Sequence, residues 1–393
     1  MRKPVLSVGG LDSIALLSPL NTTQSYLKPG QRIPLLDVCK GIAACIIVVH
    51  HLFEYSPSSH LADQFASHLL YSIYYYGLFV VHLFLVFGGF GLAIATRDNP
   101  ISLGKAFSTL GSRYLRLAAP YLVMLSFLVA VSFSTLSRGM DPPLIDSFSW
   151  LQLLAHVFFL QDILGLGNLS AGTWYLCIDI QYVALFLLMH VLLQAIGKSV
   201  KRDFSGPVAM SAILFPLGML STWSWSRVLE NDIYVFYFLG SLVLGTLVGW
   251  TLQGRIPWLV FPAYAFAMAA SLAIEFRGRV VVALGSSLIL YVGLRFWPKL
   301  RFPPALLWLG KVSYSLFLIH YLVNGLVLHG LSHWIGSSPF RAFAAMVVAF
   351  MASLLAASAL YYGVEAPCHR WVKFNRSKRL AQIADIGKTN VPQ

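Results

Sequence analysis

Three ionisable residues share one face of an apolar segment near the start of the chain. The segment 35–53 contains Asp37, Lys40 and His51. Successive residues of an α-helix are rotated by about 100° around its axis. The side chains of Lys40 and His51 would therefore differ in direction by only about 20°, and those of Asp37 and Lys40 by about 60°. Charges inside a bilayer are costly, so this stripe indicates a functional site rather than packing. Histidine suits proton abstraction near neutral pH, and His51 is the predicted general base.

Other ionisable residues are expected near the depth of His51. Glu54 follows three positions later, and Asp179 lies six residues into the apolar segment 173–196, which is expected to begin at the outer face. We expect Asp179 or Glu54 to orient the imidazole of His51. His82 in segment 71–95 and His320 in segment 305–330 fall in the same middle-to-outer region.

Two arginines precede the apolar segment 117–134. Arg113 and Arg116 are three residues apart, so on a helix they share a face. A pair of permanently charged, fork-shaped groups suits the phosphates of a nucleotide-like ligand such as coenzyme A. The alternative is that they only anchor the chain at the cytoplasmic face. Lys40 is expected close to this face, about 16 Å from His51 along its helix.

Composition defines the elements that must position these residues. Hydrophobic residues make up 58% of the 393 residues and charged residues only 11%, against roughly 25% charged in soluble domains. Ten segments have the length and apolarity of a membrane-spanning helix. Their bounds are 35–53, 71–95, 117–134, 173–196, 206–223, 234–252, 256–274, 279–297, 305–330 and 341–363. The segment Trp150–Leu164 is too short to span and carries four polar residues, so we expect it to be interfacial or re-entrant.

The distribution of basic residues predicts the topology. With ten spans and the N-terminus inside, the inside segments carry 21 lysines and arginines and the outside segments 5. This bias predicts both termini in the cytoplasm. The net charge of +13 is spread over loops, which argues against nucleic acid as a partner. The four cysteines show no metal or disulfide spacing, and no metal site is expected. We expect a flexible tail over 1–30, one membrane domain over 31–372 and a basic tail over 373–393.

Six motifs, in order over residues 30–372, resemble those of the family-three integral membrane acyltransferases. These are the O-acetylases of bacterial surface polysaccharides, lipopolysaccharides and nodulation factors. The matching stretches are Arg32 with Leu36-Asp37 through His51, Gly77–Phe90, Arg113 with Arg116, Trp174–Asp179, Gly310–His320 and Tyr361–Pro367. The first includes a basic residue followed, after ten intervening residues, by an essential histidine. Gly88 replaces a serine usual in the family, so no serine role is transferred.

The resemblance implies an all-α polytopic protein of the bacterial inner membrane. It implies transfer of an acyl group, acetyl first and succinyl or a longer chain as alternatives, from cytoplasmic acyl-CoA. The acceptor would be a hydroxyl of a carbohydrate or lipid-linked glycan, and no permanently bound cofactor is expected. His51 would act as general base or would itself carry the acyl group, and Arg113, Arg116 and Lys40 would hold coenzyme A. The expected substrate pocket comprises Trp174, Ser313, Tyr314, His320, His82 and Glu365.

The competing interpretation is a multi-spanning transporter or exporter of glycans or small molecules. Such proteins show internal repeats and discontinuous helices in two matching places. The sequence displays neither feature, and a transporter leaves the stripe on segment 35–53 without a chemical role.

Overall fold

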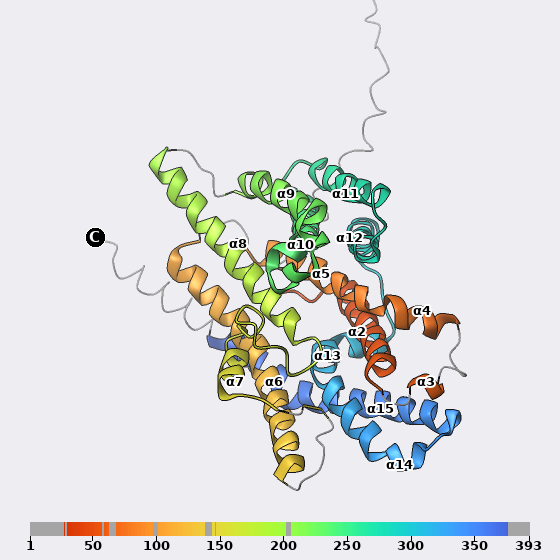
Figure 1. Ribbon diagram of the computed structural model, residues 1–393. Helices are drawn as coiled ribbons and strands as arrows, with labels where there is room; N and C mark the ends of the chain where they lie inside the picture. Colours follow the sequence, from red (N-terminus) through yellow and green to blue (C-terminus); the bar gives the residue numbers. More distant parts are fainter. Residues whose placement is uncertain are drawn as a thin grey trace, which may run out of the picture.

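The computed structural model describes Leu27 and residues 30–56, 59–62, 68–96, 101–137, 144–145, 147–201 and 206–375, so the predicted tails lie almost entirely outside the described residues. In this part of the chain the regular structure is entirely helical (Figure 1). The helices are α2 (Pro34–Tyr55), α3 (Ser59–Ala62), α4 (His68–Tyr76), η3 (Gly77–Val80), α5 (Val81–Ala95), α6 (Leu103–Ser137), α7 (Trp150–Val157), α8 (Thr173–Ser199), α9 (Pro207–Trp223), η4 (Trp225–Arg227), η5 (Leu229–Ile233), α10 (Val235–Leu252), α11 (Val260–Ala270), η6 (Ser271–Ala273), α12 (Gly278–Phe296), α13 (Pro304–Gly330), α14 (Ser332–Ile335), α15 (Pro339–Leu360) and the π-helical turn η7 (Tyr361–Glu365).

The chain is an all-α, multi-pass integral membrane protein. Among the described residues, nine helices are long and apolar enough to cross a bilayer. The tenth predicted span, 256–274, is the shorter apolar helix Val260–Ala273, which falls below the roughly 20 residues that a span needs. The third span was predicted to begin at residue 117, but α6 begins at Leu103. Arg113 and Arg116 therefore belong to the spanning helix itself and not to the loop before it.

Proline begins four of the long helices. Pro34, Pro207, Pro304 and Pro339 occupy the first turns of α2, α9, α13 and α15. The first backbone N–H groups of a helix have no partner within it, and the ring of proline fixes a helical φ, so proline is well tolerated there. A fifth proline, Pro120, lies inside α6, where it removes one backbone hydrogen bond.

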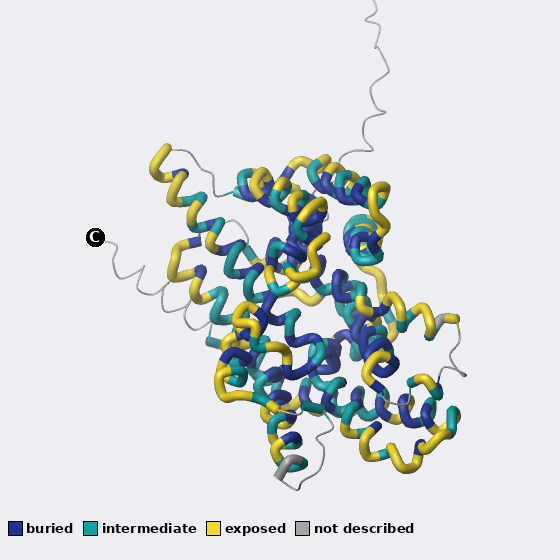
Figure 2. The backbone as a smooth tube through the Cα atoms, viewed as in Figure 1, coloured by how far each residue is buried: buried dark blue, intermediate teal, exposed yellow. Residues whose placement is uncertain are grey.

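Helix α10 lies inside the bundle, and nearly all of its residues are buried. In Figure 2 the tube is dark blue at the position of α10 in Figure 1. Glycines allow its neighbour α5 to approach closely. A side chain added at Gly245 would meet the backbone of Val86, and one added at Gly89 would meet the backbone of Leu242. Small residues at such crossings are the usual way that membrane helices pack backbone to backbone.

A second glycine contact joins α2 to α13. A Cβ on Gly41 would lie 2.8 Å from the backbone N of Gly310, and one on Gly310 would strike the backbone of Asp37. The two helices are therefore nearly in backbone contact at this level. His51 and His320, each ten residues further along, also meet, so α2 and α13 run parallel in this region.

Helix α6 lies beside α8 (Figure 1). The segment 150–164, which follows α6 in the chain, folds back along α6. The Tyr114 hydroxyl donates to the carbonyl of Val157, and the Tyr121 hydroxyl lies 2.6 Å from His156 Nδ1. Tyr121 is near the middle of the 35-residue α6. Helix α7 has only eight residues, so the segment 150–164 is too short to span. It contacts the middle of α6, and whether it is interfacial or re-entrant stays a prediction.

Candidate functional site

His51 and His320 form a buried histidine pair. The Nδ1 atom of His51 lies 2.7 Å from Nε2 of His320, and the rings are nearly parallel with centroids 5.0 Å apart. His51 is 7% exposed and His320 is fully buried. The Gly41–Gly310 contact and the parallel course of α2 and α13 bring the two rings together. The prediction placed both histidines near the site but did not foresee their direct bond.

The surroundings of His320 fix which nitrogens carry protons. Nδ1 of His320 lies 3.1 Å from the carbonyl oxygen of Leu316, and a carbonyl can only accept a hydrogen bond. In the neutral pair His320 is therefore protonated on Nδ1, and its Nε2 accepts from Nδ1–H of His51. A neutral imidazole has one protonated nitrogen, so Nε2 of His51 keeps its lone pair. That atom can accept a proton from a substrate.

Neither predicted partner occupies the orienting position. Glu54 is exposed, and Asp179 is bonded elsewhere. The partner of Nδ1 of His51 is a residue from α13, 269 positions later in the chain. The expectation that Asp179 or Glu54 orients His51 is therefore wrong in this structure, because His320 holds that nitrogen.

Asp179 forms a two-point ion pair with Arg113. The Arg113 guanidinium donates from Nε to Oδ2 at 2.8 Å and from Nη2 to Oδ1 at 2.5 Å. The side chain of Asp179 is 5% exposed and that of Arg113 is 33% exposed. This contact also shows that Arg113 and Asp179 lie at one depth, whereas the sequence placed them in opposite halves of the membrane. The early start of α6 at Leu103 places Arg113 ten residues inside that helix, where it reaches Asp179.

Lys40, Arg113 and Arg116 form a basic cluster around this ion pair. The charges of Arg113, Arg116, Asp37 and Asp179 all act on Lys40, which is half-buried on α2. Arg116 is exposed. Within the described part of the chain, no carboxylate lies within ion-pair distance of Lys40 or Arg116. These two cations are available to an anionic ligand, and Arg113 keeps further N–H groups on its exposed side.

An aromatic path leads from the basic cluster to the histidine pair. Tyr175, one turn before Asp179, lies edge-on to Phe317 with ring centroids 5.7 Å apart. Phe317 in turn lies 6.4 Å from the ring of His320. Phe84 contacts both Tyr175 and Phe317. The two polar centres are thus joined through apolar side chains of α5, α8 and α13.

Three other predicted pocket residues make structural contacts. Ser313 donates to the carbonyl of Gly310 within its own helix. The Tyr314 hydroxyl donates 2.8 Å to the carbonyl of Leu117, close to Pro120, and so ties α13 to α6. Glu365 is 4% exposed and accepts a 2.6 Å hydrogen bond from Ser315 Oγ. It belongs to the π-helical turn η7, a feature found frequently at functional sites.

A cavity of about 580 Å³ lies where α5, α8, α10 and α12 begin; we call it the end cavity. Trp174 and His82, both predicted as pocket residues, line it, whereas Ser313, Tyr314, His320 and Glu365 do not. Its other lining residues are Leu78, Phe79, Val81, Asp162, Asn168, Leu229, Asp232, Ile233, Tyr237, Phe238, Phe276, Arg277, Gly278 and Arg279. Exposed residues such as Leu229 and Phe276 form its rim.

Asp162 is the most unusual side chain of the end cavity. It is 7% exposed, and its Oδ1 accepts a 2.6 Å hydrogen bond from Asn168. The Cys177 thiol lies beside it, yet among the described residues no N–H or O–H donor reaches Oδ2. Burial raises the pKa of Asp162, and burial together with the charge of Asp162 raises the pKa of Asp232. Asp162 thus has one carboxylate oxygen, Oδ2, that is enclosed by protein atoms and has no N–H or O–H donor among the described residues.

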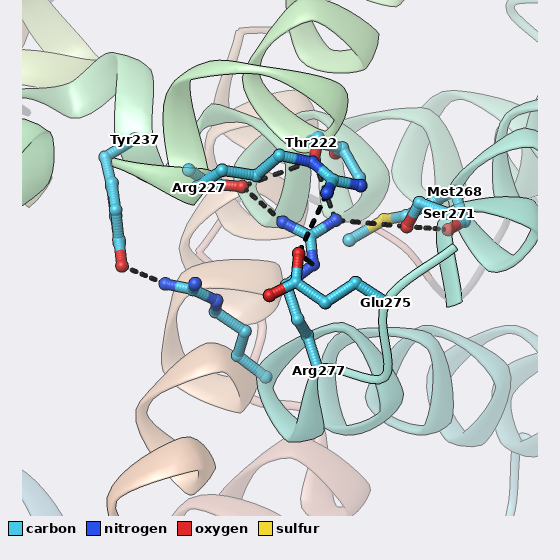
Figure 3. A network of polar contacts seen from close by, with 9 residues as sticks. Thr222, Arg227, Tyr237, Met268, Ser271, Glu275 and Arg277 are labelled. Carbon is cyan, nitrogen blue, oxygen red and sulfur yellow. Dashed lines mark hydrogen bonds and ion pairs between the residues drawn. The ribbon is translucent and has the colours of Figure 1, made fainter. Parts of the chain in front are cut away.

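A polar network around Arg277 holds one wall of the end cavity (Figure 3). Arg277 is 5% exposed and donates to the carbonyl of Thr222 and to the hydroxyls of Ser226 and Ser271. Burial lowers its pKa. Arg279, two residues on, instead donates to the Tyr237 hydroxyl at the cavity surface. Arg277 is therefore structural, while Arg279 faces the space.

Sequence reasoning missed Asp162, Asp232 and Arg279 as site residues. Each lies in or beside a connection between helices, where no periodicity marks which side chains will meet. A weak signal did exist, because all three lie at the ends of segments that the charge distribution places on one face of the membrane.

One comparison with known proteins identifies a family. The family model described as "Acyltransferase domain", acyltransferase family 3, matches residues 33–362. No curated protein and no solved structure shows significant similarity to the chain.

Proposed function

Since the chain belongs to acyltransferase family 3 and is a membrane acyltransferase, we propose that it transfers an acetyl group from acyl-CoA to a hydroxyl of an envelope carbohydrate. The observation that supports this most directly is the histidine pair, which leaves Nε2 of His51 as a buried proton acceptor. The family does not favour the transporter alternative. A buried imidazole with one unprotonated nitrogen is the group that general-base catalysis requires.

The basic cluster is the proposed site for the phosphates of the donor. Arg116 and Lys40 supply cations that have no carboxylate within ion-pair distance among the described residues. Asp179 fixes the guanidinium of Arg113, so that its remaining N–H groups point in a defined direction. The distance of about 16 Å along α2 between Lys40 and His51 would be covered by the flexible arm of the coenzyme, along the aromatic path.

The proposed reaction is a direct acyl transfer. Nε2 of His51 accepts the proton of the acceptor hydroxyl while that oxygen attacks the thioester carbonyl carbon. The carbon–sulfur bond then breaks, and the leaving thiolate takes the proton back from His51. The carbonyl of Leu316, acting through His320, keeps the pair in the tautomer that this step needs.

The basic-residue distribution supports an orientation for this reaction. Both termini and the basic cluster would face the cytoplasm, where acyl-CoA is available, and the end cavity would face the outside. The protein would then reside in a bacterial cytoplasmic membrane and acylate a glycan on its outer side.

The proposal is tested by replacing the two histidines in purified protein. We expect His51→Ala to lower the turnover of labelled acetyl-CoA by at least about a hundredfold, the range of a lost general base. His320→Ala should lower turnover less and shift its pH profile, because His320 acts through His51. His329→Ala, at the end of α13, is the matched control and should behave as the unaltered protein.

Wild-type turnover by the His51→Ala protein would refute the proposed base. A labelled acyl group retained covalently on His51 after quenching would instead identify it as an acyl carrier.

A further inference from the structure

Resting on the proposed function, we propose that the acyl acceptor reaches His51 from the end of α2 and that Tyr55 binds it, with a neutral sugar ring packed against the face of the tyrosine. The acceptor hydroxyl gives its proton to Nε2 of His51, so the two groups must come within hydrogen-bond distance. The acceptor site therefore includes side chains that touch the imidazole of His51.

Three rings contact the imidazole of His51 in the described part of the chain. That of His320 holds its Nδ1 at 2.7 Å, and that of His50 lies 5.2 Å away, centroid to centroid. Both histidines are buried, and Nδ1 of His50 donates to the carbonyl of Tyr74 on α4. The third ring is that of Tyr55, with centroids 5.1 Å apart, and Tyr55 is 53% exposed. Tyr55 is therefore the neighbour through which His51 adjoins the protein surface.

Helix geometry places the Tyr55 ring over His51. Residues four apart share a helix face, and a helical side chain leans back over the turn before it. The ring of Tyr55 thus covers the turn that carries His51, which is only 7% exposed. Tyr321, the residue after His320, lies edge-on to Tyr55 with ring centroids 5.4 Å apart. The parallel course of α2 and α13 that pairs the histidines therefore also places two tyrosine rings at a right angle beside the base.

The two substrates would reach His51 from opposite ends of α2. The proposed donor site begins at Lys40, about 16 Å before His51 along the helix, and Tyr55 lies about 6 Å beyond it. Direct transfer requires both substrates at the base at the same time, and this arrangement keeps their paths separate. With the N-terminus in the cytoplasm, as proposed, the end of α2 faces the outer side, where the glycan would be.

The chemistry of this surface favours a neutral sugar. A half-exposed tyrosine offers a broad apolar ring with a polar hydroxyl at its tip. A pyranose has a matching form, with C–H groups on its face and hydroxyls around its edge. Stacking on Tyr55 leaves that hydroxyl edge free to turn towards Nε2 of His51. Glu54 is exposed, and its charge acts on Tyr55. An acidic sugar stacked on this ring would meet a like charge, whereas a neutral one would not.

The test measures the acceptor and donor requirements separately. Purified protein in lipid nanodiscs is given labelled acetyl-CoA with methyl glycosides of a neutral hexose or of a hexuronic acid. Tyr55→Leu should raise the KM for the neutral glycoside about threefold to tenfold, the value of one aromatic contact. The KM for acetyl-CoA should be unchanged. Tyr55→Phe keeps the ring and should stay within about twofold of the wild-type glycoside KM.

A second exposed tyrosine is the matched control. Tyr75 on α4 is also 53% exposed, and its ring contacts those of Tyr71 and Tyr74. Tyr75→Leu should leave both KM values unchanged. Equal increases in the glycoside KM for Tyr55→Leu and Tyr75→Leu would mean that these tyrosines only anchor their helices at the membrane surface, and would overturn the inference.

Three other results would also overturn it. These are a wild-type glycoside KM for Tyr55→Leu, a Tyr55→Phe protein as impaired as Tyr55→Leu, and a wild type that acylates only the hexuronic acid or neither glycoside. In each of these cases acetyl-CoA turnover still depends on His51. Turnover that does not depend on His51 would instead overturn the proposed function, and this inference with it.

Discussion

Breaking the Arg113–Asp179 ion pair from either side should have unequal effects on stability. Arg113→Gln leaves the carboxylate of Asp179, 5% exposed, without its counter-charge. Removing one partner of a buried pair typically costs about 3–5 kcal/mol. Asp179→Asn leaves the guanidinium of Arg113, which is 33% exposed and can still be solvated. A lost hydrogen bond of this kind costs about 1–3 kcal/mol. We therefore expect Arg113→Gln to destabilise the protein by about 2 kcal/mol more than Asp179→Asn.

The double variant Arg113→Gln/Asp179→Asn separates the pair from its surroundings. It buries no unpaired charge, and its two amides can bond to each other, so it should be more stable than Arg113→Gln alone by about 1–3 kcal/mol. The measurement is equilibrium unfolding in mixed micelles. The ion pair between Arg227 and Glu275, whose side chains are 27% and 52% exposed, is the control. Arg227→Gln there should cost less than about 1 kcal/mol.

Two results would contradict this expectation: Asp179→Asn being the more damaging single change, or a double variant no more stable than Arg113→Gln. Either result would mean that the carboxylate is solvated or has another cation, so that the ion pair does not account for its burial. Acetyl-CoA turnover of the double variant adds a second readout. A raised acetyl-CoA KM with stability restored would show that Arg113 also contacts the donor.

Two further substitutions test the spacing of the histidine pair and the donor site. Gly41→Ala places a Cβ 2.8 Å from the backbone of Gly310, so α2 and α13 must separate. We expect turnover to fall at least about tenfold, because the hydrogen bond between His51 and His320 lengthens. The control is Gly285→Ala, which has nothing within 4 Å of its Cβ and should leave turnover unchanged. Arg116→Ala should raise the KM for acetyl-CoA by about tenfold, one charge-assisted contact, with the acceptor KM unaffected; equal increases in both constants would contradict the phosphate role.

The sequence was sufficient to predict the elements but not the contacts between them. Apolar length and loop charge located the spans, because the bilayer imposes a length on each helix independently of its neighbours. The helix 256–274 was the exception, since apolarity continues into the flanking residues Pro257 to Leu259 although the regular helix begins only at Val260. The start of α6 was misplaced for a related reason, because Lys105 and Arg113 interrupt the apolar pattern without interrupting the helix.

The sequence identified residues of the candidate site but did not show which of them bond to each other. Asp179 was assigned to His51 from its position in its own segment, yet its partner is Arg113. That assignment assumed that each segment begins at the membrane surface. Helix α6 instead begins at Leu103, and its Arg113 lies ten residues inside the helix, at the level of Asp179. The relative level of two helices depends on how they pack, and no helical period in the sequence records it.

The histidine pair shows how such a contact is nevertheless encoded. Two parallel helices rise equally, so residues at equal offsets from a close crossing lie at the same level. Gly41 and Gly310 mark the crossing of α2 and α13, and His51 and His320 each follow ten residues later. Only glycine permits the backbone contact that brings the imidazoles to 2.7 Å. The catalytic proposal for His51 thus depends on a glycine about 15 Å away along the helix, which makes Gly41→Ala a test of the chemistry as well as of the packing.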